Sequence, residues 1–126
     1  MSTTTDPLDR KQIGLLLNID DGDGDALAEI VEDYRTLSWE GRDEMRRELR
    51  HGDHTALAYT ARSLKAASSK LGAKDLAQVC GELEMHARQV ELIGSDEFAD
   101  ANELMERFEA EFTRVQVALM LLVPEG

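Results

Sequence analysis

Residues 60–73 of the chain read TARSLKAASSKLGA, and they combine the end of a helix with its stop signal. Small and apolar residues recur here at intervals of three and four, which puts them on one helix face: Leu57, Ala61, Leu64, Ser68 and Leu71. Gly72 closes the pattern, since glycine is favoured just after a helix end. Asp53 supplies an N-cap upstream. The pattern predicts an amphipathic helix between Asp53 and Gly72.

The rest of the sequence predicts four further helices, each marked by its own cap or stop signals. A short helix begins at Asp6-Pro7 and reaches about Asn18. A long helix, capped by Asp23 or Asp25, runs to about Arg50. Another begins near Lys74 and ends at Ile93-Gly94, and Ser95 caps the last one. The expected inward stripe of the long helix is Leu27, Ile30, Val31, Tyr34, Leu37, Met45 and Leu49.

The links between the predicted helices are short, and this favours antiparallel neighbours. We therefore predict an all-α fold, an antiparallel up-and-down four-helix bundle with a short extra N-terminal helix that covers one end. The 126 residues fit one domain, which we place at residues 6–126 after a disordered tail at residues 1–5.

The net charge of −12 limits the partners that the chain can have. Nucleic acid and an anionic membrane surface would both repel it. The single cysteine, Cys80, excludes an internal disulfide, and the N-terminus resembles no signal peptide. We expect a cytoplasmic monomer.

Residues 54–74 contain no acid but carry four cations: Arg62, Lys65, Lys70 and Lys74. Arg62, Lys65, Ala66 and Ser69 share the face opposite the apolar stripe, with Ala58 one turn earlier. Other exposed faces of the chain are rich in acids. A small, cationic face on such a protein favours a docking surface for a specific acidic partner, and Ala58, Arg62, Lys65, Ala66 and Ser69 are its predicted residues.

Patterns for metals and catalysis are weak in this sequence. Asp21, Asp23, Asp25 and Glu32 imitate a calcium loop, but Ala26 stands where the loop needs glycine. His51 and His54 lack further ligands of suitable spacing. No catalytic residue, metal site or cofactor is predicted.

Residues 61–73, followed by Leu76, Cys80 and Leu83-Glu84, resemble the histidine phosphotransfer (HPt) domain of bacterial phosphorelays. The family motif reads roughly A-H-x-L-K-G-x-x-x-x-L-G-A, then L-x-x-x-C-x-x-L-E. The resemblance implies a helical bundle whose partner is the receiver domain of a response regulator or of a hybrid histidine kinase. It also implies that Lys65 corresponds to the lysine that helps hold the phosphoryl group.

Two positions depart from that motif. Arg62 occupies the place of the phosphoacceptor histidine, and Ala66 replaces the glycine that lets a partner approach closely. Arginine stays protonated and offers no lone pair for attack on an aspartyl phosphate. The sequence thus favours a pseudo-phosphotransfer protein, not an enzyme, that docks on a receiver domain without accepting phosphate.

Two alternatives remain open at this point. The chain is an active phosphotransfer protein whose histidine was replaced in this sequence, or it is a helical scaffold module unrelated to phosphorelays. Ala66 leans toward a natural change, because an engineered histidine replacement would leave that position untouched.

Overall fold

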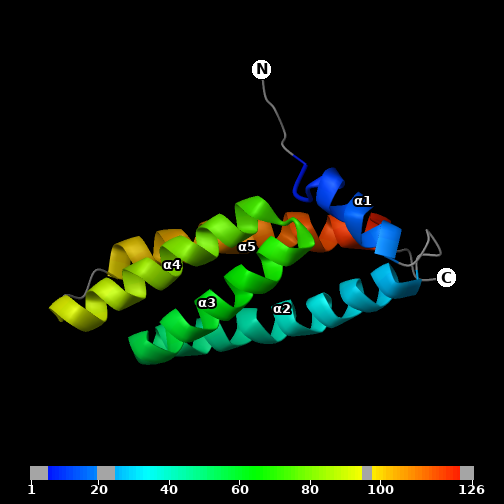
Figure 1. Cartoon of the computed structure of the whole chain (residues 1–126). Helices are drawn as coiled ribbons and strands as arrows, with labels where there is room; N and C mark the ends of the chain where they lie inside the picture. Colours follow the sequence, from blue (N-terminus) through cyan, green and yellow to red (C-terminus); the bar gives the residue numbers. More distant parts are fainter. Residues whose placement is uncertain (1–5, 20–24, 95–97, 123–126) are drawn as a thin grey trace, which may run out of the picture.

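The structure is a computed structural model, and it describes residues 6–19, 25–94 and 98–122. Every regular element in these ranges is a helix: α1 (Arg10–Ile19), α2 (Asp25–His51), α3 (His54–Leu71), α4 (Lys74–Ile93) and α5 (Phe98–Leu122). The four long helices run up and down beside one another, and α1 lies at one end (Figure 1). The predicted fold class is confirmed.

The ends of α3 show why the sequence signals were reliable there. Asp53 Oδ1 accepts a hydrogen bond from the Ala56 backbone N–H at 3.1 Å, which satisfies one free donor of the first turn. Gly72 has φ 92°, a left-handed conformation that favours glycine. This conformation lets the Ala73 N–H donate to the Ser68 carbonyl at 2.8 Å, and α4 begins at the next residue.

Helix α1 begins later than predicted, at Arg10. Asp6 accepts a hydrogen bond from the Leu8 N–H at 3.1 Å and so holds a turn before the helix. Asp9 is the residue that caps the helix, since its Oδ1 accepts from the Lys11 N–H at 2.9 Å. The Asp6-Pro7 start was therefore wrong by three residues, because a second aspartate further along satisfies the first helical turn.

Helix α1 covers the turn between α3 and α4, as the prediction of a covering helix required (Figure 1). The Asp9 N–H donates to the Gly72 carbonyl at 2.8 Å, and Gln12 Nε2 donates to the Lys70 carbonyl at 3.0 Å. Lys74 Nζ lies 2.7 Å from Asp9 Oδ2. The contact with α1 leaves no room for a side chain at Gly72, because an added Cβ would lie 3.0 Å from the Gln12 Cβ.

The core lies along the axis between the four long helices. It contains fully buried side chains from α2 to α5, of which the largest include Met45, Leu57, Leu64, Leu76, Leu83, Phe108 and Leu119. Tyr34 and Ser68 add a buried hydrogen bond of 2.7 Å between α2 and α3. The predicted caps of α2 and α5, the tail at residues 1–5, and the side chains of Leu16, Leu17 and Phe98 lie outside what the structure describes.

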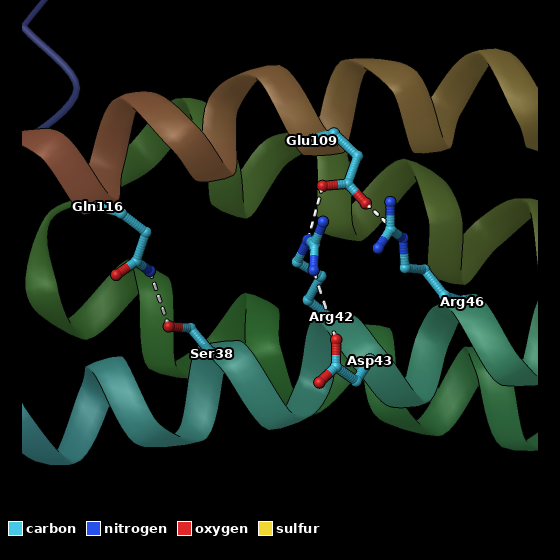
Figure 2. Close-up of polar contacts among 6 residues, drawn as sticks. All are labelled: Ser38, Arg42, Asp43, Arg46, Glu109 and Gln116. Carbon is cyan, nitrogen blue, oxygen red and sulfur yellow. Dashed lines mark hydrogen bonds and ion pairs between the residues drawn. The ribbon is translucent and has the colours of Figure 1, made fainter.

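The inward stripe of α2 differs from prediction at one turn. Leu37 is 43% exposed, and the fully buried residue is its neighbour Ser38. Ser38 Oγ accepts a hydrogen bond from Gln116 Nε2 on α5 at 3.0 Å (Figure 2). The same hydroxyl donates to the Arg35 carbonyl at 3.1 Å. A hydroxyl with both partners is stable inside the bundle, so the helix turns Ser38 inward and leaves Leu37 at the surface.

The seam between α2 and α5 is polar over a further stretch. Glu109 on α5 forms two ion pairs with α2 (Figure 2). Its Oε1 lies 2.7 Å from Arg42 Nε, and its Oε2 lies 2.9 Å from Arg46 Nε. The Arg42 guanidinium also lies 5.3 Å from the Trp39 ring centroid and 5.5 Å from that of Phe112. These contacts fix the register of α2 against α5. No helix in the described ranges is both long and apolar enough to cross a membrane.

Candidate functional site

The central turns of α3 present the predicted face to solvent. Arg62, Ala66 and Ser69 are exposed, and Lys65 is half-buried beside them. These four residues are called the Arg62 face below. The opposite side of the same turns carries Ala61, Leu64 and Ser68, which are buried in the bundle. Packing of that side fixes the rotation of α3 and points Arg62 outward.

The two cations of the Arg62 face have different surroundings. Lys65 crosses to α4, where its Nζ lies 3.3 Å from Glu84 Oε1. The lysine stem passes over Gly81, since an added Cβ there would lie 3.2 Å from the Lys65 Cδ. Arg62 has no such partner in the part of the chain that the structure describes. Its guanidinium is therefore the cation of this face that is free to meet an incoming anion.

Glu84 on α4 is the centre of a three-residue ion-pair cluster between α3 and α4. It receives Lys65 and also Arg88, whose Nη2 lies 3.0 Å from Glu84 Oε2. Burial alone would raise the pKa of Glu84, but the hydrogen bonds from Arg88 and Lys65 outweigh it, and the pKa is lowered. Glu84 thus stays ionised near neutral pH and holds Lys65 toward α4.

Ala58 does not lie on the Arg62 face. It is 3% exposed and belongs to the hydrophobic core, contrary to its predicted position on the docking surface. Helix α3 packs against both α2 and α4, so its buried arc is wide and takes in this residue. The other four predicted site residues lie on one face of α3, where three are exposed and Lys65 is half-buried.

No histidine of the described ranges lies on the Arg62 face. His51 ends α2, and His54 begins α3, about 12 Å from position 62 at 1.5 Å per residue. His86 on α4 is 9% exposed, with a buried Nε2 that has no hydrogen-bond partner among the described residues. None of the three histidines therefore contributes an imidazole to the Arg62 face.

Cys80 and the predicted metal-like patterns do not contribute to this face. Cys80 is fully buried, and burial raises the pKa of its thiol to about 12, so this thiol is a small core side chain. The Asp21–Asp25 pattern lies largely outside the described residues. Within the described ranges, no three His, Cys, Asp or Glu side chains are grouped to hold a metal ion.

The family model described as "Hpt domain" matches residues 15–118, which is most of the chain. The chain belongs to the Hpt domain family. Its fold is similar to the crystal structure of histidine-containing phosphotransfer protein B (HptB) from Pseudomonas aeruginosa PAO1, with a TM-score of 0.81 and 30% sequence identity. That match covers 94% of this chain and 95% of HptB. None of the curated proteins matches the chain.

Membership of the Hpt family connects the chain with phosphorelays. Hpt domains are phosphotransfer carriers, not classical enzymes, and they interact with receiver domains of two-component systems. The helical bundle agrees with that assignment. The sequence alone did not reveal the ion pair between Lys65 and Glu84. Two residues could have signalled it: Glu84, which stands in the family motif, and Gly81, three residues earlier, which leaves room for the lysine stem.

Proposed function

We propose that this Hpt-domain protein docks on a receiver domain through the Arg62 face and does not accept the phosphoryl group. We place it in the cytoplasm as a monomer. The observation that supports the proposal is that Arg62 is exposed on α3. The sequence motif aligns this position with the family's phosphoacceptor histidine. Arg62 has no ion-pair partner among the described residues.

The chemistry of Arg62 separates binding from transfer. An acceptor for an aspartyl phosphate needs a neutral nitrogen with a lone pair, as imidazole provides near pH 7. A guanidinium is protonated at that pH and is donor-only. The same group is well suited to bind carboxylate or phosphate, because its planar N–H donors pair with two oxygens at once.

The charge distribution favours an acidic partner at this face. Receiver domains present acidic residues around the aspartate that becomes phosphorylated. Arg62 meets such a cluster without first giving up an internal ion pair, whereas Lys65 is shared with Glu84. Docking here would occupy the phosphorylation surface of the receiver, so the protein would compete with active Hpt partners for that surface.

Direct binding tests this proposal. The full chain is titrated into purified receiver domains from the same organism, without phosphorylation, in a calorimeter. We expect saturable one-to-one binding to at least one receiver, and weaker binding as ionic strength rises, because the contact is between charged groups. Absence of binding to every receiver of the organism would contradict the proposal and favour a scaffold role outside phosphorelays.

A further inference from the structure

A cavity between α2 and α5 lies apart from the Arg62 face. Its volume is about 820 Å³, which is within the usual range of small-ligand sites. Arg46 and Arg50 line it from α2, and Asn102, Glu106 and Glu109 line it from α5. Among the described residues, α3 contributes nothing to this lining. The cavity is therefore separate from the surface that we propose for the receiver domain.

An ion pair closes the end of the cavity that lies toward Arg42. Figure 2 shows Arg46 of α2 and Glu109 of α5 pointing toward each other, with Arg46 Nε 2.9 Å from Glu109 Oε2. Glu109 Oε1 also lies 2.7 Å from Arg42 Nε. Two cations of the protein itself thus neutralise Glu109, and this acid adds no free negative charge to the cavity.

The open end of the cavity carries one positive and one negative charge that are both unpaired. Arg50 lies one turn beyond Arg46 on α2, and Glu106 lies about one turn before Glu109 on α5. Both side chains are exposed, and neither forms an ion pair with any residue that the structure describes. Although Arg50 and Glu106 line the same cavity, they do not pair with each other. The space between them is therefore bordered by a free cation on one helix and a free anion on the other.

The floor between these two walls is apolar. Leu49 of α2 is 9% exposed and Met105 of α5 is 8% exposed, and both line the cavity. A ligand with a single charge would leave either Arg50 or Glu106 unpaired. A simple anion would also be repelled by the net charge of −12. A neutral zwitterion with an apolar body complements the floor and both walls.

We propose that this cavity binds a small zwitterion with an apolar body, either a free amino acid or a short peptide with free termini. The ligand's carboxylate accepts hydrogen bonds from the Arg50 guanidinium and from the Asn102 amide, which lies one turn before Glu106 on α5. Its ammonium group donates to the Glu106 carboxylate. Its apolar side chain covers Leu49 and Met105, which removes apolar surface from water.

Titration followed by nuclear magnetic resonance tests the proposal on the unchanged, isotopically labelled full chain. L-leucine and L-leucyl-L-leucine are added separately, so that the two sources of this chemistry are distinguished. We expect saturable shifts of the Arg50, Asn102 and Glu106 backbone amides with at least one of the two. N-acetyl-L-leucine lacks the ammonium group and L-leucinamide lacks the carboxylate. Each of these analogues should bind at least about tenfold more weakly than the zwitterion, because one wall of the cavity stays unpaired.

Two pairs of variants test the named side chains. Arg50→Gln and Glu106→Gln should each lower the affinity for the zwitterion at least about tenfold. Arg47→Gln and Glu103→Gln are the matched controls, since both residues are exposed on the same two helices but do not line this cavity, and they should leave the affinity unchanged. Circular dichroism confirms that each variant is folded.

Three results would overturn this proposal: no saturable shifts with either zwitterion at tens of millimolar, equal binding of the singly charged analogues, or unchanged binding by both Arg50→Gln and Glu106→Gln. None of them bears on receiver docking, which is measured without these ligands.

Discussion

Arg62→Glu should lower the affinity for the receiver domain at least about tenfold, which corresponds to about 1.4 kcal/mol of binding free energy. The substitution reverses the charge that meets the receiver's acidic cluster and adds a repulsive contact there. It should not destabilise the bundle, because Arg62 is exposed and makes no ion pair with the described residues. Calorimetric titration at two ionic strengths measures the effect.

Lys11→Glu is the matched control for this prediction. Lys11 is an exposed cation on α1, so its reversal changes the net charge by the same amount at a different helix. We expect little change in affinity for this variant. Equal weakening by both variants would mean that long-range charge, and not contact at position 62, governs binding.

Leu83→Ala should lower the free energy of unfolding by about 2–5 kcal/mol. Leu83 on α4 is fully buried in the core, so its truncation removes apolar contacts and leaves a cavity that the packed helices fill only in part. Leu64 on α3 is 1% exposed, so Leu64→Ala should lower the free energy of unfolding by a similar amount. Urea denaturation followed by circular dichroism measures both changes.

Leu92→Ala is the control on the same helix as Leu83. Leu92 is 85% exposed, so its truncation should change stability by less than about 0.5 kcal/mol. A loss at Leu83 no larger than that at Leu92 would show that α4 does not pack as described.

The ends of α3 and α4 could be predicted because their signals are local. Asp53 caps α3 through its own side chain, and Gly72 and Gly94 adopt left-handed conformations at the two helix ends. A residue's own chemistry decides such positions. The start of α1 was missed because two aspartates, Asp6 and Asp9, offer competing caps within a few residues.

Features that depend on contacts between helices were harder to predict from the sequence. Leu37 and Ser38 exchange their expected places because Gln116, far along the chain, supplies the partner for the Ser38 hydroxyl. Ala58 lies inside because α3 has neighbours on two sides. The difference between Lys65 and Arg62 also depends on another helix, since Glu84 on α4 forms an ion pair with Lys65 and none with Arg62.

The most direct test of the central claim is phosphoryl transfer itself. Receiver domains labelled with radioactive phosphate at their aspartate are incubated with the full chain, and with a histidine-bearing Hpt protein as a positive control. We predict that label moves to the control protein and that none appears on this chain, even with the receiver that it binds most tightly. Stable label on this chain would contradict the claim that it docks without accepting phosphate.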